Sequence, residues 1–279
     1  MERKSRIQTS NGGSQFNRLQ WMRWPGGMTL QLGQAPPLKG LQPIITLSSE
    51  EKTEVYDPLA VHGLAIEFAK IKTPDQALAF SNSYGLLGLD QEPARFFDKA
   101  RRLSGIAEPA WDWLKAVAPI ALVLELWGMV DSEDSASLRR RIRWERAGVF
   151  LSYEDGQKIW IVTPVTDTGR WLEKWKRGDL VGPALHYIAT LTNRYLRGKS
   201  SAMIELGPQG KLTSHSSPVN LHSALWLQVA DIVTGKRRIR PCSICKDLMD
   251  VTDNRGHKAV HSQCSLRERM RRYRRKGSA

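Results

Sequence analysis

Three cysteines and a histidine near the end of the 279-residue chain have the types and the spacing of a metal site. Cys242 and Cys245 are separated by two residues, and after 15 further residues His261 and Cys264 are again separated by two. Zinc prefers thiolate and imidazole ligands, and two such pairs hold one ion in a tetrahedral structural site. The spacing therefore predicts that Zn²⁺ binds to Cys242, Cys245, His261 and Cys264 and supplies folding energy to this polar segment.

Other interpretations of these residues remain open. A disulfide is disfavoured by the odd number of cysteines and by the polar, basic first 25 residues, which do not resemble a secretion signal. Buried cysteines without a metal are an alternative, but residues 246–263 contain little apolar material around them. His257 lies four residues before His261 and is a second candidate for the fourth ligand, although the two-residue spacing favours His261.

Basic residues are concentrated around the predicted metal site. Of 42 basic and 28 acidic residues in the chain, residues 236–279 hold 14 basic and four acidic ones. The residues after Cys264 have high helix propensity, and a helix of arginines suits a polyanion because each guanidinium offers forked donors to phosphate oxygens. We therefore predict a nucleic-acid partner for Arg237, Arg238, Arg240, Arg267, Arg271, Arg272, Arg274 and Arg275. The alternative is a solvated tail, and a solvated face is also the favoured interpretation of the arginines between 139 and 146.

The C-terminal segment resembles the zinc finger of the CGNR family. The resemblance rests on Lys236-Arg-Arg-Ile-Arg-Pro-Cys242, on Asp253-Asn-Arg-Gly256, on His261-Ser-Gln-Cys264 and on the arginine tail. It differs from the family pattern in the spacing of the first cysteine pair, in His261 where the family has cysteine, and in Cys264-Ser-Leu-Arg267. The resemblance implies a bacterial transcription regulator that binds DNA, with a mainly helical ABATE-like domain before the finger.

The preceding residues predict an α+β fold, with a mainly α-helical body, a small antiparallel sheet and a treble-clef-like zinc finger. We divide the chain into an N-terminal arm, partly disordered, over 1–50, a body over 51–235 and the finger over 236–279. Caps, proline positions and apolar periodicity predict helices over 74–84, 92–103, 109–128, 136–147 and 183–196, and from Ser217-Pro218 to Gly235. In the helix over 183–196, the inward face is expected to consist of Leu185, Ile188, Leu191 and Tyr195. Strands are expected over 28–32, 44–47 and 158–163, and a hairpin over 202–213. Because the last helix leads directly into Lys236, we expect the finger to be docked on the body.

The chain lacks the usual signatures of an enzyme, so we expect a binding protein. Cys242-x2-Cys245 matches half of a cytidine-deaminase signature, but no H-x-E motif precedes it, and the other histidines are scattered. A zinc-dependent nuclease is the least improbable enzyme, although four protein ligands would leave no open position for water. We expect a cytoplasmic protein without a membrane span, bound to DNA in preference to RNA. A protein-interaction module in which the finger only stabilises the C-terminus is the alternative, and the sequence does not fix the oligomeric state.

Overall fold

The computed structural model describes residues 21–33, 42–48, 53–89, 107–146, 148–153, 157–162, 174–206, 212–252 and 260–276. Its helices are the 3₁₀ turn η1 (Pro58–Ala60), α1 (Leu64–Phe68), α2 (Pro74–Tyr84), α3 (Ala110–Asp131), α4 (Ser135–Arg141), α6 (Val181–Leu196), α7 (Leu221–Val233) and α8 (Ser262–Lys276). Its strands are β1 (Trp21–Arg23), β2 (Met28–Gly33), β3 (Gln42–Leu47), β4 (Glu54–Tyr56), β5 (Ala107–Pro109), β6 (Ile142–Glu145), β7 (Gly148–Ser152), β8 (Lys158–Val162), β9 (Ser200–Leu206), β10 (Leu212–Pro218), β11 (Ile239–Pro241) and β12 (Leu248–Asp250).

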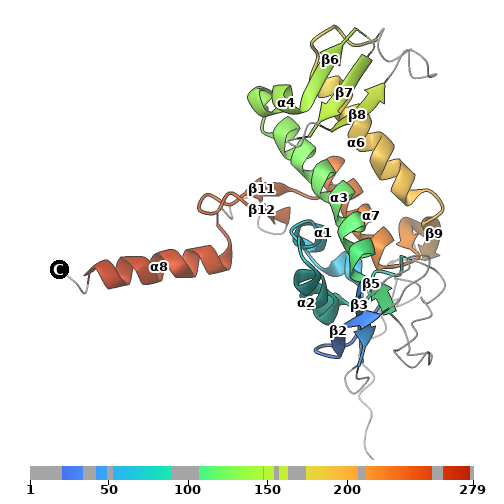
Figure 1. Cartoon of the computed structure of the whole chain (residues 1–279), viewed down its shortest axis with the longest axis vertical. Coiled ribbons are helices and arrows are strands. Elements are labelled where there is room, and N and C mark those ends of the chain that lie inside the picture. Colours follow the sequence, from blue (N-terminus) through green and yellow to red (C-terminus); the bar gives the residue numbers. More distant parts are fainter. Residues whose placement is uncertain are drawn as a thin grey trace, which may run out of the picture.

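The long helix α3 forms the axis of the body. It contacts α1, α2, α4, α6 and α7, and the sheets β2-β3-β5 and β6-β7-β8 lie at its opposite ends (Figure 1). Trp113 of α3 is fully buried and packs against the rings of Phe68 and Phe80. By length and composition alone α3 is apolar enough to cross a membrane, but its position makes it the central helix of the hydrophobic core.

The predicted mixture of helices and antiparallel strands is confirmed, but the expected number of sheets was too small. The described residues form five antiparallel sheets of two or three strands each, in place of one small sheet. Residues 21–33 and 42–48 contribute three of these strands, and Trp24, Met28 and Ile45 are buried in the main core. The predicted hairpin after α6 is present as β9-β10, in which Leu206 pairs with Leu212 and Ser200 with Pro218.

The ends of α2 follow the local sequence signals, whereas the start of α7 does not. Thr73 caps α2 by accepting a bond from the Gln76 N–H, and Gly85 ends the helix at a φ of +86°. Ser217 and Pro218 were expected to begin α7 but are the last residues of β10. The cap of α7 is Asn220, whose side chain accepts from the Ser223 N–H at 2.8 Å. Pairing with β9 outweighs the helix-start signal of Ser217-Pro218 because it satisfies backbone groups along the hairpin.

The helix predicted over 136–147 is too long. The helix α4 ends at Arg141, and residues 142–145 form β6, which pairs with β7. Ile142 is buried and Trp144 is half-buried, so the apolar positions two residues apart match a strand as well as a helix. The sheet partner resolves the ambiguity, because a lone strand would leave its backbone groups unpaired.

The helix α6 covers α7, and its inward face is narrower than predicted. Ile188 and Leu191 are buried as expected, but Leu185 is 39 % exposed, so its assignment to the inward face was wrong. Tyr195 stacks on Trp226 with ring centroids 4.5 Å apart. The indole N–H of Trp226 donates to Nε2 of His222 at 3.1 Å, which requires the neutral imidazole.

His222 is predicted to make stability depend on pH. Burial, and to a lesser extent the Lys199 ammonium, lower the pKa of His222 to about 4, whereas the unfolded value is about 6.5. The unfolded chain therefore binds a proton that the native state rejects, and stability is lost as the pH falls from about 6.5 to 4. Between pH 7 and pH 5 the free energy of unfolding of the wild-type protein should fall by about 2 kcal/mol more than that of a His222→Gln variant. Denaturant unfolding at both pH values measures this difference, and equal losses would contradict the prediction.

Several expectations lie outside the described residues. These are the helix over 92–103, the state of the first twenty residues, and the loop that contains Asp253 and His257.

Candidate metal centre and basic helix

The hairpin β11-β12 carries the first pair of predicted ligands at its tip. Cys242 directly follows β11, and its N–H donates to the carbonyl of Asp247 at 2.8 Å while its carbonyl accepts from the Lys246 N–H at 2.9 Å. Lys246 has a φ of +68°, a left-handed conformation that tightens the turn after Cys245. This tight turn brings the sulfur atoms of Cys242 and Cys245 to the same side of the hairpin.

The second pair of ligands lies at the start of α8. His261 immediately precedes the helix and Cys264 is in its first turn. One ligand atom from each of Cys242, Cys245, His261 and Cys264 lies within 4.8 Å of the others, and Cys245 Sγ is 3.4 Å from His261 Nδ1. Ligands about 2.0–2.3 Å from a zinc ion would lie roughly 3.5–4 Å apart in a tetrahedron. The cluster can thus hold a metal ion, and its donor set of three sulfurs and one imidazole fits zinc.

The pKa values of two thiols in the cluster, Cys242 and Cys264, are shifted in opposite directions. Burial opposes the ionisation of Cys242, but the N–H groups of Cys245, His261 and Ile244 lower its pKa to about 5. Burial raises the pKa of Cys264, and the nearby sulfurs of Cys245 and Cys242 raise it further, to about 11. Adjacent sulfurs cannot all become thiolates without a compensating charge, and a divalent cation supplies that charge.

The finger has a very small hydrophobic core of its own. Cys242, Met249 and Val251 are buried together, and Val260 and Cys264 pack against them. A core of this size offsets little of the conformational entropy of ordering residues 236–276. A bound metal would therefore supply most of the stability of this part of the chain.

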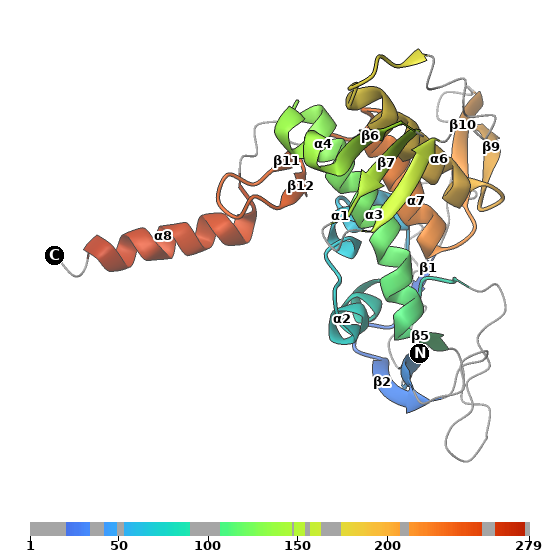
Figure 2. The same cartoon turned by 45° about the horizontal axis from the view of Figure 1, so that its top comes forward.

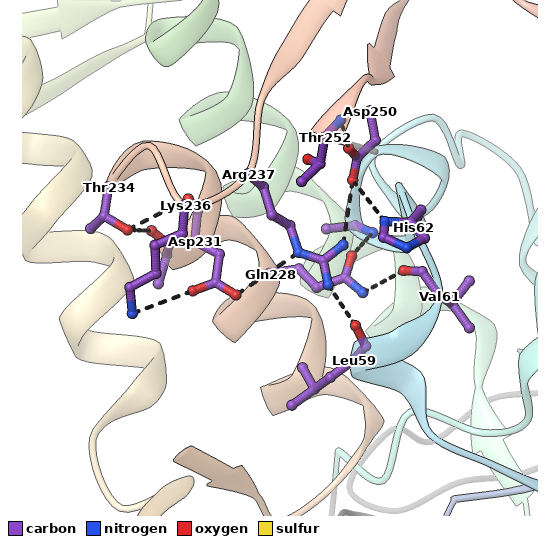
Figure 3. Close-up of polar contacts among 12 residues, drawn as sticks. Leu59, Val61, His62, Gln228, Asp231, Thr234, Lys236, Arg237, Asp250 and Thr252 are labelled. Atoms are coloured by element: carbon purple, nitrogen blue, oxygen red, sulfur yellow. Dashed lines mark hydrogen bonds and ion pairs between the residues drawn. The ribbon is translucent and has the colours of Figure 1, made fainter. Parts of the chain in front are cut away.

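Arg237 joins the finger to the body (Figure 3). Its guanidinium is 3.3 Å from Oδ2 of Asp250 in β12, donates to the Leu59 carbonyl in the body at 2.5 Å, and lies 3.9 Å from Asp231 of α7. Burial opposes the ionisation of Asp250, but the hydroxyl and N–H of Thr252, together with Arg237 and the His62 ring, hold the pKa of Asp250 below its ordinary value.

A second layer of contacts supports the same junction. The buried Gln228 of α7 donates to the carbonyls of Pro58 and Val61 and accepts from the Ala65 N–H, which fixes the loop that receives Arg237 (Figure 3). Just after the C-terminal end of α1, Lys70 forms an ion pair with Asp247 at 3.3 Å. The hairpin β11-β12 is therefore docked on the body, as expected from the direct connection through α7.

The three arginines that precede the metal site differ in exposure, because Arg237 is mostly buried whereas Arg238 and Arg240 are exposed. The Arg237 side chain is 12 % exposed and is held by the junction, so it is not part of an exposed phosphate-binding surface. Arg238 and Arg240 are exposed on either side of the buried Ile239, because a strand places alternate residues on opposite faces. The sequence contained no signal for the role of Arg237, since its partner at Leu59 is 178 residues away.

Arg237→Ala and Arg238→Ala should have different effects on stability. Loss of Arg237 leaves Asp250, which is 5 % exposed, without its main charge partner, and breaking a buried pair in this way costs about 3 kcal/mol. Arg238→Ala removes an exposed side chain of the same type and should change stability by less than about 0.5 kcal/mol. Denaturant unfolding of the two variants tests this, and equal losses would show that the junction does not depend on Arg237.

The helix α8 projects away from the body (Figures 1 and 2). Its sequence contains seven basic residues and one acidic residue, Glu268. Arg267 is exposed and, with His62 and Lys70, borders a groove of about 680 Å³ between α1 and the metal cluster. Arg271, Arg272, Arg274 and Arg275 lie in the second half of the helix. Leu266 and Met270 are 56 % and 52 % exposed, respectively.

Comparison with models of known protein families, with curated proteins and with solved structures finds no match.

Proposed function

We propose that the protein is a zinc-dependent, DNA-binding transcription regulator, and that residues 236–279 form its nucleic-acid-binding finger. In this proposal Zn²⁺ is held by Cys242, Cys245, His261 and Cys264. The hairpin β11-β12 with its ligand turn, followed by a second ligand pair at the start of a helix, fits a treble-clef-like finger. The resemblance to CGNR zinc fingers favours a bacterial regulator that acts in the cytoplasm, and four protein ligands favour a structural ion over a catalytic one.

One observation carries the proposal. The metal cluster holds the first turn of α8, and this strongly basic helix extends away from the body (Figure 1). Fifteen residues of α-helix are about 22 Å long, and like charges along such a helix repel one another without a polyanion. Phosphates would relieve this repulsion, while the metal fixes the direction in which the helix leaves the finger.

A second candidate function is supported by a different feature of α8. Leu266 and Met270 are four residues apart and therefore lie on one side of the helix, where both are more than half exposed. An apolar pair of this kind fits a contact with another protein. RNA is a further possible ligand, because phosphate contacts alone do not distinguish the two sugars.

The proposal is tested by fluorescence anisotropy of a labelled 20-base-pair duplex, titrated with the zinc-loaded full-length protein between 50 and 300 mM NaCl. About six phosphate contacts would give a slope near −5 for the logarithm of affinity against the logarithm of salt concentration. Single-stranded and double-stranded RNA of the same sequence are added as competitors, which compares the affinities for RNA and DNA. Polyglutamate is a further competitor and measures the attraction to any polyanion.

The outcomes separate the candidates. A steep salt dependence with weaker competition by RNA and polyglutamate supports a DNA-binding regulator. If RNA competes more strongly than DNA, the ligand of the finger is RNA and not DNA. An affinity that is independent of salt, or no binding at 50 mM NaCl, would reject the nucleic-acid function and leave the protein-interaction module.

A further inference from the structure

A cavity lies between the body and the hairpin β11-β12, next to the groove beside Arg267, and the two share Ile66, Lys70, Asp247 and Leu248 in their linings. The volume of the cavity is about 500 Å³. Volumes of this order hold small organic ligands, which bind most often at boundaries between structural units. The cavity contains none of the four metal ligands, and the nucleic-acid function proposed above does not use it.

The inner walls of the cavity are apolar and come from both parts of the chain. The body contributes Ile66 of α1 together with Leu124 and Met129 of α3, and the hairpin contributes Ile239 and Leu248. Ile66, Leu124 and Ile239 are at most 7 % exposed, so they form a fixed floor. An apolar group of a ligand would gain burial against this floor, at about 0.8 kcal/mol for each methylene removed from water.

One end of the cavity is acidic. Four carboxylates line it, and two of these have basic partners, because Asp247 pairs with Lys70 and Glu125 with Arg141. The other two are exposed. Asp134 is already engaged, because it caps α4 by accepting from the Ser137 N–H at 3.0 Å and lies near Arg140. Asp131 forms no ion pair with any residue that the structure describes. Asp131 is the last residue of α3, and the C-terminus of a helix carries partial negative charge. This end of the cavity therefore favours a cation and disfavours an anion.

Lys246 is the other cationic residue that lines the cavity besides Lys70. Its ammonium group donates to the Ser243 carbonyl at 3.1 Å, within the ligand turn of the hairpin. An acidic end next to an apolar floor is the complement of an amine that carries an alkyl or aromatic group.

We propose that this cavity binds a small organic amine, with its ammonium group at Asp131 and its apolar part against Ile66, Leu124 and Ile239. Because the walls belong to both the body and the hairpin, the bound amine holds the two together. The site thus gives the body a means of responding to a small molecule and of changing how firmly the finger is held.

The probe is octylammonium, with octanoate and 1-octanol as matched compounds of the same chain length. Isothermal titration calorimetry with the zinc-loaded full-length protein should show binding of octylammonium and at least tenfold weaker binding of octanoate. Hydrogen exchange of the amides in residues 239–250 should become slower with octylammonium and stay unchanged with octanoate.

Two variants and one control locate the binding site. Gly128 lies within α3 and lines the cavity, and a Cβ added there meets nothing within 4 Å. Gly128→Leu should therefore fill the cavity, keep the fold and abolish binding. Asp131→Asn should weaken octylammonium about tenfold. Glu133→Gln removes the same charge from an exposed residue of the same turn that does not line the cavity, and it should bind within twofold of wild type.

Each result bears on the proposal. Loss of binding in Gly128→Leu with an unchanged circular dichroism spectrum, together with the difference between Asp131→Asn and Glu133→Gln, supports it. Equal affinities for octylammonium and octanoate would overturn the assignment of the acidic end. Wild-type affinity in Gly128→Leu, or no binding of octylammonium at millimolar concentration, would overturn the site itself. All of these results are independent of nucleic-acid binding.

Discussion

Cys242→Ser is expected to remove zinc from the protein and to unfold the finger while the body stays folded. Cys242 is fully buried in the cluster, so the substitution replaces a thiolate ligand by a hydroxyl group at the centre of the site. Structural zinc supplies about 10 kcal/mol or more of binding free energy at pH 7. The small core of Cys242, Met249 and Val251 cannot compensate for a loss of that size.

Three measurements check this expectation. Elemental analysis should give one zinc per chain in the wild type and less than 0.1 in Cys242→Ser. Hydrogen exchange in residues 239–276 should rise to nearly the unfolded rate, while α3 and α7 stay protected. Ser243→Ala, an exposed residue of the same turn, is the matched control and should keep its zinc. A metal-free wild-type protein with a protected finger would contradict the metal centre.

The same assay decides the fourth ligand. His261 Nδ1 lies with the sulfurs in the cluster, so His261→Ala should lose zinc as Cys242→Ser does. His257 lies outside the described residues, and His257→Ala should retain zinc. Retention of zinc in His261→Ala and its loss in His257→Ala would instead identify His257 as the fourth ligand.

Replacing Arg271, Arg272, Arg274 and Arg275 by glutamine is expected to weaken binding to duplex DNA by at least 100-fold at 100 mM NaCl. Each phosphate contact contributes about 0.9 to the salt slope, so the slope should fall in magnitude by about 3.6 if all four arginines meet phosphates. Glutamine has high helix propensity and keeps much of the side-chain length, so the helix should persist. Fluorescence anisotropy across salt measures both effects.

The matched control removes the same number of charges from the body. Arg139, Arg140, Arg143 and Arg146 are exposed on α4, β6 and the adjacent turn, and their replacement by glutamine lowers the net charge equally. We expect less than a fivefold loss for this variant, because the proposed interface is α8. Similar losses in both variants would indicate attraction by overall charge without a specific surface. If neither arginine variant loses DNA affinity while Cys242→Ser abolishes the protein's activity in cells, the protein-interaction module would be favoured.

The sequence alone determined those features that depend on short spacings. The four candidate ligands are two pairs with two-residue gaps, and each pair needs only one turn of backbone to converge. The ends of α2 depend on Thr73, Pro74 and Gly85, which act within one turn of the helix. Such signals are complete within a few residues, so no distant part of the chain was needed to interpret them.

The tertiary structure decided every feature whose partners are far apart in the chain. Arg237 and Arg238 are neighbours with the same side chain, yet Leu59, Asp231 and Asp250 hold only the first. Glu108 is buried, and it accepts bonds from the Leu87, Gly88 and Leu89 N–H groups and from the Trp113 indole. The strand β6 and the cavity beside α3 likewise exist only because β7 and β11-β12 pack where they do. A side chain's burial and partners are set by the whole fold, and local spacing carries no information about them.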